Sequence, residues 1–134
     1  MSGLEVIAER STSVADVVRC ADGIVEIRVY DGAIVDVPQM NEILAAQTAI
    51  VTGPFAVMVD ARKVRSMTRG AQERTAGTAS QRSARAVAIL VASPVSRLLG
   101  NFFVKLARPV YPTRLFGDEV AARRWLLRFS EDRK

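Results

Sequence analysis

The sequence predicts one α/β domain, built on a mixed, mostly parallel sheet with four helices. Two continuous apolar runs, residues 55–60 and 86–92, are typical of strands buried on both faces of a parallel sheet. Segments with helical periodicity alternate with these runs. An Asp-Gly pair at residues 22–23 separates two strand-like segments, which indicates a β-hairpin. With 134 residues and 49% hydrophobic content, the chain suits a single domain over residues 1–134.

The first half is expected to contain the hairpin, a helix and a buried strand. Residues 1–12 fit either an edge strand or a flexible tail. Apolar and polar residues alternate over residues 25–30, as in a half-buried strand. Asp36 and Gln39 have the spacing of a capping box, and a Gly-Pro pair at residues 53–54 ends the helix that they begin.

The second half is expected to alternate helices with strands. Capping residues mark three helix starts, and a proline marks the last strand as an edge strand. The expected caps are Thr68, Ser93 and Asp118. The helix after Thr68 is expected to end near residue 80. The last strand is expected to cover residues 111–116, which include Pro112. The predicted element order is ββαβαβαβα, which is entered through the antiparallel hairpin and continues with parallel strands.

The composition argues against catalysis and against a metal or cofactor site. The chain has no histidine, the commonest general base and metal ligand. Cys20 is the only cysteine, so it cannot form an internal disulfide, and we expect it to be a buried small hydrophobe. Glycine-rich phosphate-binding motifs are absent from the sequence. We therefore expect a protein that is not an enzyme and carries no cofactor.

The same composition favours a cytoplasmic protein. No apolar run approaches the ~20 residues that a membrane span requires. The first residues lack the basic region and the apolar stretch of a signal peptide. A lone cysteine is consistent with a reducing compartment.

Charge is distributed unevenly along the chain. Residues 1–60 carry a net charge of −6, and residues 61–134 carry +11. A basic half of this kind can bind anions or nucleic acid. The favoured interpretation is that the two halves form one domain in which these charges partly face each other.

The basic loop after the first buried strand is the best candidate site. It follows the carboxyl end of a strand, where α/β sheets place ligands, and it leads into a helix N-terminus, which favours anions. The candidate residues are Asp60, Arg62, Lys63, Arg65, Ser66, Thr68 and Arg69. The alternative is a solvated loop in which Ser66 or Thr68 only caps the helix. Asp60 is expected to anchor the loop, paired with Arg62 or Arg65.

The helix after Ser93 has an apolar stripe over residues 95–106. Its members include Leu98, Leu99, Phe102 and Phe103. One interpretation is an exposed contact patch that forms a homodimer. The other is that all of these side chains belong to the core.

The chain resembles STAS domains, the anti-sigma-factor antagonist family with the SpoIIAA-like fold. The resemblance covers residues 13–130 and lies in the element order and in the buried strand that ends in Asp60, followed by the loop at residues 61–70. Uncharacterised bacterial STAS-like proteins share in addition the segments at residues 22–25, 59–69, 93–97, 100–103 and 112–116. The resemblance implies a regulatory module that binds proteins.

One departure from the family concerns its phosphorylation switch. Family antagonists are regulated on a serine that follows an aspartate in the loop. When Asp60 is aligned with the family's strand-end aspartate, Thr68 and Arg69 fall where that Asp-Ser pair belongs. The switch is then either lost or displaced to Ser66 or Thr68.

Three functions follow from these observations. The first is a non-catalytic regulatory module that presents the loop and the helix after Ser93 to an unknown protein partner. The second is a domain that binds a small molecule or a lipid, because the small residues of the helix after Thr68 leave space opposite Leu98, Leu99 and Phe102. The third is anion or nucleic-acid binding by the basic half, which ranks last because its basic stretch lacks interleaved aromatic residues.

Overall fold

The structure, a computed structural model, describes residues 5–76, 84–107 and 111–130. The main sheet contains β1 (Val6–Ser11), β2 (Ala15–Cys20), β3 (Ile24–Val29), β5 (Phe55–Asp60), β7 (Ala84–Leu90) and β8 (Thr113–Phe116). A two-stranded ribbon pairs β4 (Ile34–Val35) with β6 (Ser66–Met67). The helices are α1 (Val37–Ile50), α2 (Arg69–Ala76), α4 (Pro94–Phe102) and α5 (Glu119–Ser130).

The strand order of the main sheet is β1-β2-β3-β5-β7-β8. Strand β2 is antiparallel to both of its neighbours, β1 and β3, whereas β3, β5, β7 and β8 run parallel to one another. The predicted mixed, mostly parallel sheet with its antiparallel hairpin is therefore confirmed. Within the stretch left open as edge strand or tail, residues 6–11 form β1 at one edge of the sheet, and β8 lies at the opposite edge, as Pro112 predicted.

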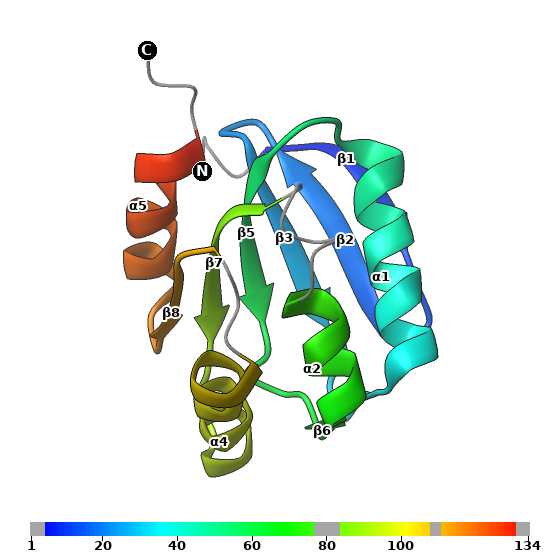
Figure 1. The fold of residues 1–134 in the computed structure, drawn as a ribbon. Coiled ribbons are helices and arrows are strands. Elements are labelled where there is room, and N and C mark those ends of the chain that lie inside the picture. The colour runs from blue at the N-terminus through cyan, green and yellow to red at the C-terminus, as the bar shows by residue number, and fades with distance from the viewer. Residues whose placement is uncertain (1–4, 77–83, 108–110, 131–134) are drawn as a thin grey trace.

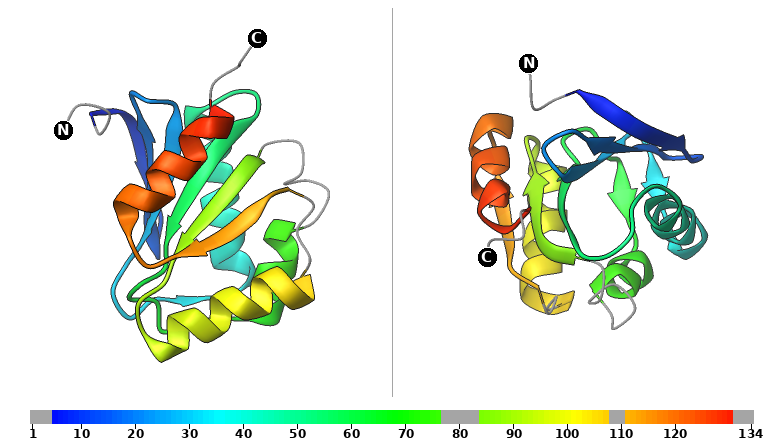
Figure 2. Two further views of the ribbon diagram at one scale, coloured as in Figure 1. Left: turned by 90° about the vertical axis from the view of Figure 1, so that its left-hand side faces the viewer. Right: turned by 90° about the horizontal axis from the view of Figure 1, so that it is seen from above.

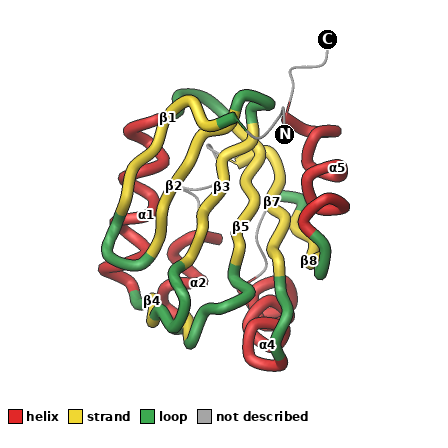
Figure 3. Tube along the Cα trace, turned by 180° about the vertical axis from the view of Figure 1, so that it is seen from behind, coloured by secondary structure: helices red, strands yellow, loops and turns green. Residues whose placement is uncertain are grey.

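Helices cover the two faces of the sheet unequally. Figure 1 shows α1, α2 and α4 on the near face, while α5 stands at the side. Figure 2 shows α5 on the opposite face of the sheet from the other three helices. From behind, in Figure 3, the strands lie in front of α1 and α2, and α4 lies beyond the ends of β5 and β7. We call these the front face, with three helices, and the back face, with α5.

Each face has its own apolar core. Ile27, Val57 and Ile89 point from the sheet into the front core, which α1 completes with Ile43. The back core is smaller and is sealed by α5. None of the described helices combines the length and the hydrophobicity needed to cross a membrane.

Local signals account for where the helices begin. The carboxylate of Asp36 accepts a hydrogen bond from the Val37 N–H, and Gln39 Oε1 accepts one from the Asp36 N–H, which completes the predicted capping box. Ser93 caps α4 in the same reciprocal way with Ser96. Side-chain caps of this kind satisfy backbone donors that a helix leaves free at its start.

Three features differ from the predicted elements or extend beyond them. The short β4–β6 ribbon was not predicted, because two-residue strands carry no periodicity. Helix α4 ends at Phe102 and continues as a π-helical turn over Phe103–Ala107. The predicted end of the second helix near residue 80 lies outside the described residues.

Close contact between α4 and the sheet depends on Gly100. A Cβ atom at this position would lie 2.8 Å from Leu115 Cδ2 and 3.3 Å from Val91 Cγ1. Any residue larger than glycine would therefore press on β8. This contact sets the distance between α4 and the front face.

Candidate functional site

A large cavity lies between the front face of the sheet and the three helices that cover it. Its volume is about 750 Å³. Strands β3, β5 and β7 form its floor, and α1, α2 and α4 contribute its walls. Much of the lining is apolar and includes Ile27, Val57, Ile89, Ile43, Leu99 and Phe103.

Helix α2 contributes Gln72 and Arg74 to the described lining. Its small residues lie elsewhere, since Gly70 faces Val37 of α1 and Ala71 is fully buried in the front core. A pocket was expected between this helix and the helix after Ser93, and Leu99 of that helix is part of the lining.

Two of the buried residues that line the cavity carry uncharged amides. Gln72, from the second turn of α2, is 2% exposed, and Gln47, from the last turns of α1, is 8% exposed. Gln72 Nε2 donates to the carbonyl of Met67 at 3.3 Å, but Gln72 Oε1 has no partner among the described residues. Side-chain amides in an apolar interior normally find hydrogen-bond partners.

The loop predicted as the site contributes apolar side chains to the cavity. Ala61, Val64 and Met67 line it. The charged side chains of Lys63 and Arg65 are exposed to solvent. This loop therefore has one face toward the cavity and another toward solvent.

Asp60 and Arg62 form a closed pair within this loop. Arg62 Nε and Nη2 donate to the two carboxylate oxygens of Asp60 at 2.9 and 2.7 Å. Burial alone would raise the pKa of Asp60, but the hydrogen bonds from Arg62 outweigh it and lower that pKa. Arg62 also lies 3.6 Å from Glu119 at the start of α5. The expected pairing of Asp60 with Arg62 is confirmed, and Asp60 anchors the loop.

The other candidate residues of the loop are divided among separate contacts. Thr68 Oγ1 donates to Asp36 Oδ1 at 2.8 Å and accepts the Ala71 N–H at 3.2 Å, so Thr68 caps α2. Arg69 pairs with Glu73 one turn along the helix. Ser66 lies in β6, half-buried. The loop thus brings Asp60 and Arg62 together, but its cations do not converge on one point, because two of them contact carboxylates of the protein.

The apolar stripe of α4 is also divided. Leu98 is 70% exposed, whereas Leu99 is half-buried and lines the cavity. Phe103 is 6% exposed and belongs to the front core, which corrects its placement in an exposed patch. The reason is that the π-helical turn begins at Phe103, next to the cavity. The side chain of Phe102 lies outside the described part of the structure.

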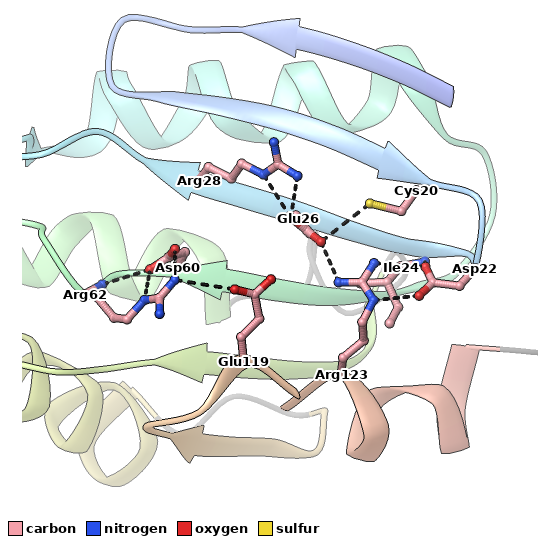
Figure 4. Close-up of polar contacts among 9 residues, drawn as sticks. All are labelled: Cys20, Asp22, Ile24, Glu26, Arg28, Asp60, Arg62, Glu119 and Arg123. Atoms are coloured by element: carbon pink, nitrogen blue, oxygen red, sulfur yellow. Dashed lines mark hydrogen bonds and ion pairs between the residues drawn. The ribbon is translucent and has the colours of Figure 1, made fainter. Parts of the chain in front are cut away.

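A charged network on the back face was not predicted from the sequence (Figure 4). Arg123 of α5 donates to Asp22 at 2.7 Å and to the buried carboxylate of Glu26. Burial would raise the pKa of Glu26, but hydrogen bonds from Arg123 and Arg28 lower it. The partners are about a hundred residues apart, so no short motif could have revealed the network.

The thiol of Cys20 completes this network. Its sulfur lies 3.5 Å from Glu26 Oε2, and Cys20 is fully buried, as expected. Burial and the neighbouring carboxylate raise the pKa of this thiol. A protonated, inaccessible thiol is chemically inert, so Cys20 has a structural role.

Comparison with known proteins identifies the group to which this fold belongs. A family model described as a domain of unknown function, DUF7793, matches residues 18–130. The chain is also similar to the crystal structure of an uncharacterised protein of the DUF3478 family with a SpoIIAA-like fold, from Shewanella loihica PV-4. That similarity has a TM-score of 0.52 and 13% identity, and it covers 90% of this chain and 91% of the other. No curated protein matches the chain. The predicted SpoIIAA-like (STAS-like) fold is confirmed.

Proposed function

The chain belongs to the DUF7793 family, and with its SpoIIAA-like fold as the premise, we propose that it is a non-catalytic binding module that holds a small apolar molecule. The observation that carries this proposal is the cavity of about 750 Å³ between the front face and α1, α2 and α4. Sites for small molecules in proteins are apolar cavities of about 300–1,000 Å³ with a few polar groups.

The close packing that is usual in protein interiors supports the presence of a ligand in this cavity. Protein interiors are close-packed and rarely contain voids larger than one water molecule. Water fills a buried space well only where each molecule finds two to four polar partners, and much of the described lining is aliphatic or aromatic. An apolar ligand would restore the dispersion contacts that the lining side chains lack.

The absence of histidine from the sequence and the closed ion pairs support a module without catalysis. Asp60, the acid at the end of the central strand, is held by Arg62, and Glu26 is held by Arg28 and Arg123. A carboxylate with a lowered pKa and bound arginines is a poor general base. A reproducible turnover that disappears in Asp60→Asn would overturn this part of the proposal.

The binding proposal is tested with the neutral fluorescent probe N-phenyl-1-naphthylamine. We expect saturable binding by the purified protein. Val57→Phe, which places a larger side chain on the cavity floor, should weaken binding by at least about tenfold, or about 1.4 kcal/mol. Met58→Leu is the matched control, because the adjacent Met58 packs in the back core and should leave probe binding unchanged. Absence of saturable binding by the wild type would refute the proposal.

A second candidate function is the presentation of a surface to a protein partner. Leu98 on α4 and Ile34 on β4 are 70% and 55% exposed. Helix α4 contacts β6, which pairs with β4, so both side chains belong to neighbouring elements. Lys63 and Arg65 extend from the adjoining loop. An exposed apolar surface with basic neighbours suits a cytoplasmic partner, or a second copy of this chain.

The two functions are compatible, because the loop that carries Val64 and Met67 into the cavity also carries Lys63 and Arg65 on its outer side. A ligand that displaces the inner side chains would change the outer surface. This coupling would make the module regulatory.

Leu98→Glu should abolish partner capture, or dimerisation in sedimentation experiments, without a change in thermal stability. If the wild type and Leu98→Glu capture the partner equally, and the wild type is a monomer, the proposed protein-binding surface is wrong.

A further inference from the structure

We infer that the cavity selects an uncharged ligand, with an apolar body and two hydrogen-bonding groups that pair with the side chains of Gln47 and Gln72. This inference rests on the proposed function and adds the chemical class of the ligand. It follows from three observations. They are the two glutamine side chains at the cavity wall, one of which has an unpaired oxygen, the spacing of these side chains along parallel helices, and the charges of the described lining.

Gln72 supplies an acceptor without a donor. Its Nε2 is occupied by the carbonyl of Met67, whereas Oε1 is buried and has no partner among the described residues. Leaving a buried acceptor unpaired costs about 1–3 kcal/mol. The terminal torsion of a glutamine side chain is soft, so a small rotation would turn Oε1 toward a donor in the cavity. A ligand hydroxyl or amide N–H would remove the cost of the unpaired oxygen.

Gln47 supplies a second amide, which can both donate and accept. The residue is 8% exposed and lines the cavity, and no described residue forms a hydrogen bond with its side chain. A leucine or methionine would suit this position of α1 better in an empty apolar pocket. A glutamine at the cavity wall is explained if the occupant carries a polar group.

The helices fix how far apart these amides lie. Thr68 contacts Asp36 at the starts of α2 and α1, and Arg74 contacts Asn41 further along, so the two helices run side by side in the same direction. Along this pair Gln47 lies about seven residues beyond the level of Gln72, or roughly 11 Å at 1.5 Å per residue. The ligand is therefore elongated, with its polar groups near opposite ends.

The charges of the described lining disfavour an anionic ligand. Arg74 is the only charged residue among the described residues of the lining. Its side chain is exposed, and its Nε donates to Asn41 Oδ1 at 2.9 Å. Placing a carboxylate or phosphate in an apolar cavity without a buried cation is strongly unfavourable. Neutral hydroxyl, carbonyl or amide groups carry no such cost once they are paired.

The test is competition for the N-phenyl-1-naphthylamine site between two probes of equal length. We expect 1,12-dodecanediol to displace the fluorophore at a concentration at least about tenfold lower than dodecanedioate, because only the dioate must bury charge. Gln47→Leu and Gln72→Leu should each weaken the diol roughly three- to tenfold, the range of one hydrogen bond. Met58→Leu, in the back core, is the control and should bind the fluorophore and the diol as the wild type does.

Thermal unfolding of the free proteins separates a ligand role from a structural one. Gln72→Leu should unfold at the same temperature as the wild type or a higher one, because the unpaired Oε1 is removed together with only one hydrogen bond, the long one to Met67. Lower stability, equal displacement by diol and dioate, or unchanged diol affinity in both variants would overturn the inference and leave the proposed function intact. Failure of the wild type to bind the fluorophore would overturn both.

Discussion

At the scale of single residues, most polar side chains of the predicted site serve the fold. Thr68 joins two helix starts, since it caps α2 through the Ala71 N–H and donates to Asp36, the cap of α1. The sequence predicted the capping role but gave no signal for the contact with Asp36, which is 32 residues away. The ion pairs of the loop arginines were likewise predictable only where the two residues are close in sequence, as for Asp60 and Arg62.

Thr68→Ala should lower the free energy of unfolding by about 1 kcal/mol, the usual loss for a helix cap. Denaturant unfolding measures this loss. Ser66→Ala, at a half-buried position of β6 that caps no helix, is the control and should stay within about 0.5 kcal/mol of the wild type.

Substitutions of Thr68 also test whether the family's phosphorylation switch is retained in this loop. If Thr68 is such a switch, Thr68→Ala and Thr68→Glu should have opposite effects on partner capture at similar stability. Equal capture by the two variants, together with no phosphate on residues 66–68 of protein from the native cell, would show that the loop is structural.

At the scale of elements, the strands were the most predictable part. The run at residues 55–60 matches β5, and the Asp-Gly turn lies between β2 and β3. The cavity was foreseen only as an absence of large residues in the helix after Thr68. Its polar groups were only partly visible in the sequence. Gln47 falls on the apolar stripe of its helix as the one polar interruption, whereas Gln72 looks like an ordinary residue of an exposed helix face until the packing of α1 against α2 is known.

Gly100→Ala tests how closely α4 is held against the sheet. Alanine favours a helix over glycine by about 1 kcal/mol. The new methyl group would meet Leu115 Cδ2 at 2.8 Å, so we expect net destabilisation by about 1–2 kcal/mol. Adding Leu115→Val should restore much of the loss. If Gly100→Ala is more stable than the wild type, β8 can move away from the new methyl group without a loss of stability.

At the scale of the whole molecule, the uneven charge distribution is partly internal. Acidic residues of the first half, Asp22, Glu26 and Asp60, pair with Arg123 and Arg62 of the second half. These contacts agree with the interpretation that the two halves face each other. Net charge alone could not distinguish this arrangement from a nucleic-acid surface.

Arg123→Met should lower the free energy of unfolding by about 3 kcal/mol, because it leaves carboxylates of the network without their cation. Arg124→Met, at the neighbouring exposed position, is the matched control. A loss no larger than that of the control would show that the network contributes little.

The contribution of Glu26 should also depend on pH. Its pKa is lowered in the folded protein, so the stabilisation is complete above the ordinary value of 4.5 and is lost as pH falls through the folded pKa. The stability difference between the wild type and Glu26→Gln should therefore shrink in acid. A difference that stays constant from neutral to acid pH would contradict this assignment.

The contact between Arg123 and Asp22 also constrains how the chain folds as it is synthesised. These residues are 101 positions apart, and α5, which seals the back core, is the last described helix. Until α5 leaves the ribosome, Ile24 and Met58 lack their cover. A nascent chain that pauses before residue 119 would present an apolar sheet face and would depend on a chaperone to avoid aggregation. Synthesis of α5 would then allow the back core to close, because its contacts with Ile24 and Met58 join segments that are far apart in sequence.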